Sequence, residues 1–121
     1  MVVRLKNAII ESIEDTETRK LKVLNMVSKE EGARVVLELP EVLCDTMNPK
    51  DEVTIVIDSK PIARGPNAKL YAEGKVFRIK EDTGLEVVGA IGGLRLVLTI
   101  SKPAASQRNT FDSDKFLLAI I

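Results

Sequence analysis

The side chains in this sequence that could do acid–base chemistry are carboxylates in two short clusters. One cluster lies near the start of the chain and the other in its second half: Glu11, Glu14, Asp15 and Glu17, then Glu81 and Asp82. Paired carboxylates act as general acid and base when their surroundings separate their pKa values. Clusters beside turns are typical of solvated surface charge. We therefore predict that neither cluster is a catalytic site.

Nucleophilic and metal chemistry is restricted by the absence of histidine and by a single cysteine, Cys44. This excludes Ser–His and Cys–His nucleophile pairs, histidine general bases and Cys/His zinc sites. Cys44 follows Pro40 and the apolar pair Val42-Leu43, so we predict that it fills apolar space rather than reacting as a free thiol. A lone cysteine cannot form an intramolecular disulfide, which favours a reducing, cytoplasmic setting. We expect no enzyme, no metal and no cofactor.

Glycines in the second half of the chain invite comparison with a phosphate-binding loop: Gly84, Gly89, Gly92 and Gly93. Such a loop needs a Walker-type lysine and a following helix whose N-terminus holds the anion, and the sequence has neither pattern. We predict that all four are hairpin glycines. Gly92-Gly93 suits the positive φ angles of a two-residue hairpin, and Asp82-Thr83-Gly84 suits a slightly longer one.

A local basic group is the strongest indication of a nucleic-acid surface: Lys69, Lys75, Arg78 and Lys80. The 18 basic and 18 acidic residues cancel, so no global attraction to nucleic acid or acidic membranes is expected. Single-strand binders also need stacking aromatic side chains. The chain has few of these: Tyr71, Phe77, Phe111 and Phe116. We predict that Phe77 and Phe116 are core residues, which leaves Tyr71 as the one stacking platform and nucleic-acid contact as weak or indirect.

The elements that position these residues are predicted to be β-strands, because apolar residues alternate with period two. The alternation is clear in 34–39, 52–58 and 94–101, and is strongest in the last of these. Three consecutive antiparallel strands are predicted over Leu70–Lys80, Leu85–Ile91 and Leu94–Ser101. Further turns are predicted at 30–32 and 48–51. Turns at such short spacing are typical of a barrel or sandwich.

The two ends of the chain differ in how clearly they predict structure. Phe116–Ile121 is apolar, uncharged and β-prone, so it should be paired inside the sheet. Near the start, Val2, Leu5, Ile9 and Ile13 fit a helical stripe as well as a strand, and the pattern alone does not decide. Pro61–Asn67 is predicted to be an exposed loop, too short to separate two cores.

Size and hydropathy predict a single domain over residues 1–121. No stretch approaches the ~20 apolar residues that cross a bilayer, so no membrane association is expected.

Three segments, in order, resemble one protein family: Tyr71–Phe77, with Gly74 between its aromatic residues, then Val87–Leu94 with its Gly-Gly-Leu, then the closing Asp114–Ile120. Together they are similar to the C-terminal half of subunit eight of archaeal and eukaryotic DNA-directed RNA polymerases. Upstream segments follow the family's order more loosely, so the resemblance spans nearly the whole chain. The short 59–69 connection, where eukaryotic members carry a long acidic insertion, makes an archaeal member the better match.

The resemblance implies an all-β, antiparallel eight-stranded OB-like barrel with short connecting loops, and strands in place of the N-terminal helical alternative. It implies a non-catalytic subunit that docks on the largest polymerase subunit and stabilises it, with no small-molecule substrate. The predicted docking residues surround one hairpin: Tyr71, Lys75, Gly92, Gly93, Leu94 and Arg95. Two rival functions remain open, an autonomous OB-type single-stranded nucleic-acid-binding module and an enzyme that uses carboxylates alone.

Overall fold

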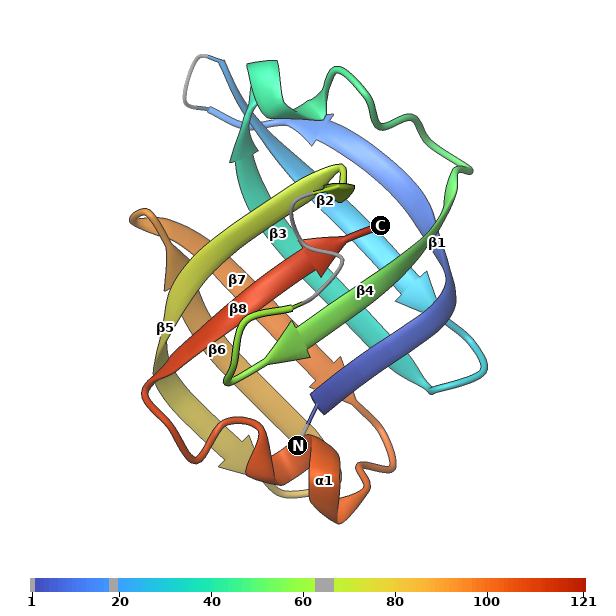
Figure 1. Cartoon of the computed structure of the whole chain (residues 1–121). Coiled ribbons are helices and arrows are strands. Elements are labelled where there is room, and N and C mark those ends of the chain that lie inside the picture. The colour runs from blue at the N-terminus through green and yellow to red at the C-terminus, as the bar shows by residue number, and fades with distance from the viewer. Residues whose placement is uncertain (1, 18–19, 63–66) are drawn as a thin grey trace.

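The computed structural model describes residues 2–17, 20–62 and 67–121 and forms one closed barrel of antiparallel strands (Figure 1). The strands are β1 (Val2–Asp15), β2 (Leu21–Ser28), β3 (Ala33–Pro40), β4 (Glu52–Asp58), β5 (Leu70–Glu81), β6 (Leu85–Ile91), β7 (Leu94–Ile100) and β8 (Lys115–Ile120). Around the barrel they run β1-β2-β3-β7-β6-β5-β8-β4, and β4 closes the ring by pairing with β1. The predicted all-β, OB-like eight-stranded barrel is confirmed.

The N-terminal segment is a strand, so the helical alternative is wrong, and two register shifts explain why the sequence was ambiguous. The pairing of β1 shifts between Leu5 and Ala8, where Asn7 has a φ of 56°, and again between Ile10 and Ser12. Each irregularity offsets the two-residue alternation by one position. The buried residues Val3, Leu5, Ala8 and Ile10 therefore lack a continuous two-residue period, and Ile9 of the predicted helical stripe is 45% exposed.

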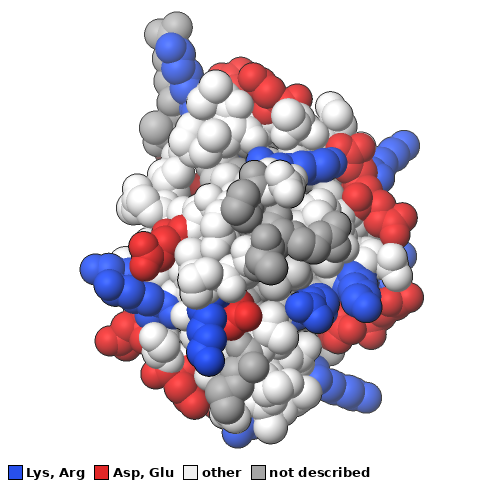
Figure 2. Space-filling view, viewed as in Figure 1, with Lys and Arg blue, Asp and Glu red and all other residues white. Residues whose placement is uncertain are grey.

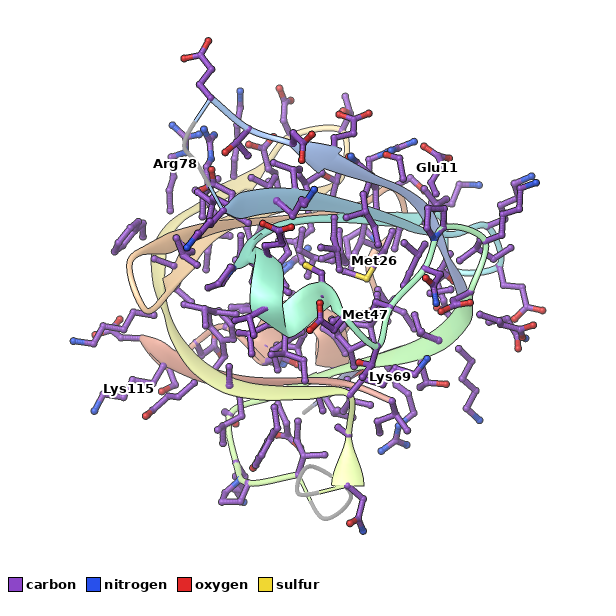
Figure 3. All side chains as sticks on the ribbon, turned by 90° about the horizontal axis from the view of Figure 1, so that it is seen from above. Glu11, Met26, Met47, Lys69, Arg78 and Lys115 are labelled. Carbon is purple, nitrogen blue, oxygen red and sulfur yellow. The ribbon has the colours of Figure 1, made fainter. Side chains whose placement is uncertain are left out.

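In strands without a bulge, the two-residue alternation of apolar and polar residues forms the barrel interior. On β3 and β7 the predicted apolar faces point inward, and Leu96 is 0% exposed. Seen from above, Met26 and Met47 lie in the middle of the barrel, while Glu11, Lys69, Arg78 and Lys115 point outward (Figure 3). The buried apolar side chains of the described residues form one cluster, which includes residues from all eight strands.

Two short helical segments, which the strand pattern did not predict, lie at opposite ends of the barrel (Figure 1). One is the 3-10 helix η1 (Glu41–Cys44), which contacts β2 and β3. The other is α1 (Ala105–Asn109), which contacts β1 and begins where the Ala104 amide donates to Gln107 Oε1 at 2.8 Å. Neither helix among the described residues is long and apolar enough to cross a bilayer.

The predicted turns are confirmed, with one correction among the glycines. Gly92 and Gly93 connect β6 to β7 with φ angles of 59° and 83°, as a two-residue hairpin requires. Gly89 instead lies inside β6, where a Cβ would come within 2.6 Å of the Lys75 carbonyl oxygen and 3.1 Å of Phe116 Cε1. Gly89 is therefore a packing glycine rather than a hairpin glycine.

The C-terminal strand is internal, as its apolar sequence predicts. β8 pairs with β4 on one side and with β5 on the other, and Phe116, Leu118 and Ile120 point into the core. Of the predicted loop Pro61–Asn67, residues 63–66 lie outside the described residues, and Ile62 is joined to β5 by its amide, which donates to Tyr71 Oη at 3.0 Å.

Candidate functional site

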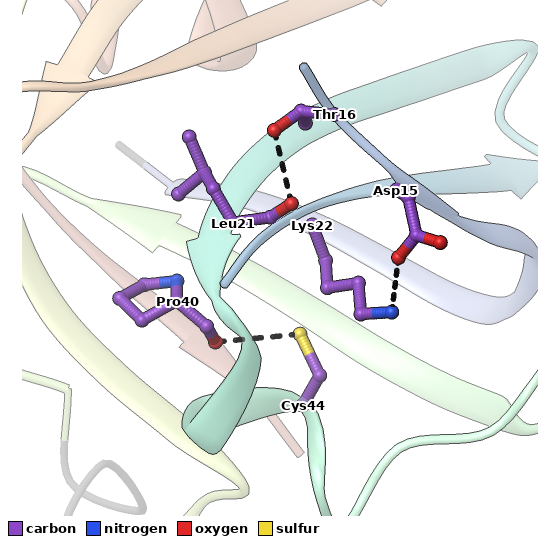
Figure 4. Close-up of polar contacts among 6 residues, drawn as sticks. All are labelled: Asp15, Thr16, Leu21, Lys22, Pro40 and Cys44. Carbon is purple, nitrogen blue, oxygen red and sulfur yellow. Dashed lines mark hydrogen bonds and ion pairs between the residues drawn. The ribbon is translucent and has the colours of Figure 1, made fainter. Parts of the chain in front are cut away.

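The two carboxylate clusters are exposed and are partly engaged in ion pairs. Glu11 accepts from Arg34 at 3.3 Å, and Glu81 accepts from Arg108 Nε at 3.0 Å. Asp15 pairs with Lys22, and this contact raises the pKa of the Lys22 ammonium (Figure 4). These contacts are those of solvated barrel surface, and the surface depression beside Glu81 is also lined by the Arg108 that neutralises it.

Cys44 ends the 3-10 helix as a buried free thiol, consistent with the predicted apolar filler. Its Sγ donates to the Pro40 carbonyl oxygen at 3.7 Å (Figure 4). Burial raises the pKa of the thiol above its ordinary value. The thiolate, which is the reactive form, is therefore disfavoured at neutral pH.

Phe77 is not a core residue, contrary to the sequence-based expectation. The pairing of β5 with β6 shifts between Val76 and Arg78, so Phe77 is the extra residue of a β-bulge. Its ring is left 72% exposed, whereas Phe116 on β8 is 1% exposed and packs edge-to-face on Phe111 at 6.2 Å. Phe77 lies two residues after Lys75 on the outward face of β5, so its large apolar side chain is on the outer surface of the barrel, and the bulge shifts the register of the residues that follow it.

A hollow of about 330 Å³ lies beside Phe77 on the outer face of β5, β6 and β8. Its lining residues come from three strands and one hairpin: Glu73, Gly74, Lys75, Phe77, Ala90, Gly92, Gly93 and Lys115. A Cβ added at Gly92 or Gly93 would meet no atom within 4 Å, so the space in front of the turn is open. We call this feature the Phe77 hollow.

Every residue that lines the Phe77 hollow belongs to one of three sequence segments: 71–77, 87–94 and 114–120. Tyr71–Phe77 supplies the β5 wall, Val87–Leu94 the β6 wall and the hairpin, and Asp114–Ile120 the β8 wall. The strands bring these segments together because β6, β5 and β8 are consecutive neighbours in the barrel. Segments separated in sequence thus form one continuous surface.

Two lysines dominate the electrostatics of the Phe77 hollow. Lys75 on β5 lies directly opposite Lys115 on β8 in the antiparallel register, so both side chains project from the same outer face. Within the described part of the chain neither ammonium group has an ion-pair partner. Glu73, two residues before Lys75 on the same face of β5, is the acidic residue of the lining.

The structure brings some of the predicted docking residues together and separates others. Lys75, Gly92 and Gly93 line the Phe77 hollow, and Leu94 and Arg95 continue from its hairpin into β7. The Arg95 amide donates to Glu38 Oε1 at 2.9 Å, which joins this hairpin to β3. Tyr71 lies outside the hollow, half-buried, with its hydroxyl accepting the Ile62 amide.

The basic group is also rearranged relative to the sequence-based expectation. Lys69 pairs with Asp51 at 4.0 Å and points away from Arg78 and Lys115, which project on another side of the barrel (Figure 3). Lys115 takes its place beside Lys75, and sequence reasoning missed it because the register of β8 against β5 is not visible in the pattern. Arg78 is paired with Glu86 at 3.7 Å.

Charges of both signs are mixed over the visible face of the molecule rather than segregated (Figure 2). Within the described ranges, no three His, Cys, Asp or Glu side chains gather closely enough to hold a metal ion.

Comparison of the sequence with models of known protein families and with curated proteins gave no match.

Proposed function

We propose that this protein is a non-catalytic accessory subunit of a cytoplasmic, archaeal-type DNA-directed RNA polymerase, and that it docks on the largest subunit and stabilises it. The observation that carries the proposal is the composition of the Phe77 hollow. All of its lining residues come from the three segments that resemble polymerase subunit eight. A surface assembled from those three segments alone is therefore our candidate for the surface that docks on the largest subunit.

The physical character of this surface supports docking of a protein. An exposed aromatic side chain beside a concave, glycine-walled space is the kind of anchor that dominates interface energies. Phe77 provides the exposed ring, and Gly92 and Gly93 let a partner's backbone approach closely. The barrel behind it is closed and fully paired along β6 and β8, so the anchor is held on a rigid support.

The test is co-expression of the tagged protein with the largest subunit of an archaeal RNA polymerase, followed by affinity capture and size-exclusion chromatography. We expect a stable complex with the wild-type chain and at least ~10-fold weaker binding for Phe77→Ser. Val42→Ser is the matched control, since Val42 on η1 is 70% exposed and lies away from β5. Both variants should unfold at the wild-type midpoint, because neither side chain is in the core.

A single-stranded nucleic-acid-binding module is the second candidate, and the exposure of Phe77 is the observation that favours it. OB-type barrels bind single strands with stacking aromatic residues and cations along one face. Phe77 lies among Lys75, Arg78 and Lys80 on β5, which supplies the platform that Tyr71 does not. Fluorescence anisotropy with a labelled oligothymidylate distinguishes the candidates: tight binding that weakens with salt and with Phe77→Ala supports the module.

A further inference from the structure

The two lysines of the Phe77 hollow have an arrangement that the barrel alone does not explain. Like charges placed directly opposite each other on neighbouring strands destabilise a sheet. Lys75 and Lys115 are such a pair, and no acidic side chain of the described residues forms an ion pair with either of them. A carboxylate between them would remove the repulsion and accept charge-assisted hydrogen bonds from both ammonium groups.

The apolar part of the hollow lies next to this charged pair. Phe77 follows Lys75 by two positions on β5, and Ala90 on β6 is directly opposite Lys75. An apolar side chain that sits beside the bound carboxylate therefore contacts the Phe77 ring and the Ala90 methyl group. The open space before Gly92 and Gly93 leaves room for the backbone that carries both side chains.

Glu73 places a negative charge at one end of the hollow. It lies on the same face of β5 as Lys75, two residues earlier, so a second anionic group at that end would be repelled. A run of phosphates along β5 would meet Glu73, and Arg78 is already paired with Glu86. A protein segment with a single acidic side chain fits this charge pattern better than a nucleic-acid strand does.

We propose that the Phe77 hollow binds an extended segment of the partner subunit that carries one acidic side chain, held between Lys75 and Lys115, next to an apolar side chain packed on Phe77. The inference rests on the proposed function, because the segment is taken to belong to the largest polymerase subunit. It adds the chemistry of the recognised segment, which the resemblance does not supply.

The test compares three double lysine substitutions in the capture of the largest subunit. The variant Lys75→Glu/Lys115→Glu should bind at least ~10-fold more weakly than wild type, and Lys75→Arg/Lys115→Arg should retain most of the binding. The control Lys6→Glu/Lys29→Glu changes the net charge equally at two exposed lysines outside the hollow and should bind normally. Unfolding midpoints of all variants establish that the barrel is intact.

The outcomes separate the inference from the proposed function. If wild type and Lys75→Glu/Lys115→Glu capture the subunit equally well, the proposed function stands and the carboxylate site is wrong. If wild type captures no subunit, the proposed function fails and the inference fails with it. An NMR titration adds a third outcome. It compares the concentrations at which oligothymidylate and a peptide containing one Glu and one Leu shift the Lys75 and Lys115 signals. If oligothymidylate acts at the lower concentration, the surface recognises nucleic acid and the inference is overturned.

Discussion

Phe116 and two glycines form a packing unit that explains why small residues interrupt β5 and β6. A Cβ at Gly74 would lie 2.5 Å from Phe116 Cζ, and one at Gly89 would lie 3.1 Å from Phe116 Cε1. The aromatic ring of β8 therefore covers both glycines, Gly74 on the adjacent strand β5 and Gly89 on the next strand β6. Each of the segments 71–77, 87–94 and 114–120 contributes one residue to this unit.

The substitution Gly89→Ala tests this packing. The added methyl group would also lie 2.6 Å from the Lys75 carbonyl oxygen, which belongs to the backbone and cannot move aside cheaply. We expect a loss of about 1–3 kcal/mol in the free energy of unfolding, measured by chemical denaturation. Val88→Thr, on the outward face of the same strand, should change it by about 0.5 kcal/mol or less. Equal effects of the two substitutions would contradict the packing role of Gly89.

Leu96 tests the assignment of the barrel interior. It is fully buried on β7, so Leu96→Ala removes apolar contacts and leaves a cavity. We expect a loss of about 2–5 kcal/mol in the free energy of unfolding. Leu94→Ala, at the half-exposed start of the same strand, should cost clearly less. An unfolding midpoint for Leu96→Ala equal to that of wild type would place Leu96 outside the core.

The Cys44 thiol has a pH dependence whose sign follows from its burial. The folded-state pKa is raised above the ordinary 9.0, so the folded chain retains its proton where the unfolded chain loses it. The stabilisation is present below pH 9.0 and is lost as the pH rises through the folded-state pKa. We expect iodoacetamide to alkylate the native protein more slowly than the urea-unfolded chain between pH 7 and 9. Equal rates would show that the thiol is exposed and unperturbed.

Among the elements, β5 contributes half of the residues that line the Phe77 hollow. Its first half pairs with β8 and its second half with β6. Lys75 pairs with both strands, and the bulge between Val76 and Arg78 follows it. Phe77 shares the outward face of β5 with Lys75, and the bulge shifts the faces of the residues that follow it. The exposed aromatic residue of the proposed site is thus also the bulge residue of β5.

The strands that could be predicted from the sequence are those with an uninterrupted two-residue period, such as β3 and β7, because one face of each is buried along its whole length. The bulges in β1 break that period, which left the N-terminal segment undecided. Phe77 shares the outward face of β5 with Lys75, so its apolar type alone did not predict its side of the sheet. The contribution of Lys115 depended on inter-strand register, which a single sequence does not reveal.

The terminal strand β8 is required for closure of the barrel. It pairs with β4 and β5 and buries Phe116, Leu118 and Ile120. Deletion of residues 115–121 should expose two strand edges and part of the core, and abolish cooperative unfolding. Circular dichroism and thermal melts check this, with deletion of Ile121 alone as the control that leaves β8 itself intact. A cooperative transition in the longer deletion would contradict an essential role for β8.

The whole molecule combines a closed antiparallel barrel with one outer surface that carries an exposed aromatic side chain. The closed ring of described strands leaves none of them with a complete edge free for pairing with another chain, so recognition is assigned to side chains on the outer face. The Phe77 hollow combines an exposed ring, a lysine pair and a glycine hairpin on that face. The carboxylate clusters, in contrast, are spread over the exposed surface and are partly neutralised by ion pairs.

Association with the polymerase is tested by affinity purification of the tagged protein from its native cells, with stringent washing and mass spectrometry of the retained proteins. We expect recovery of the largest RNA polymerase subunit in near-stoichiometric amount. The subunit should no longer be recovered with Phe77→Ser, but should still be recovered with Val42→Ser. Recovery of the protein alone, or with partners unrelated to the polymerase, would contradict the proposed polymerase function.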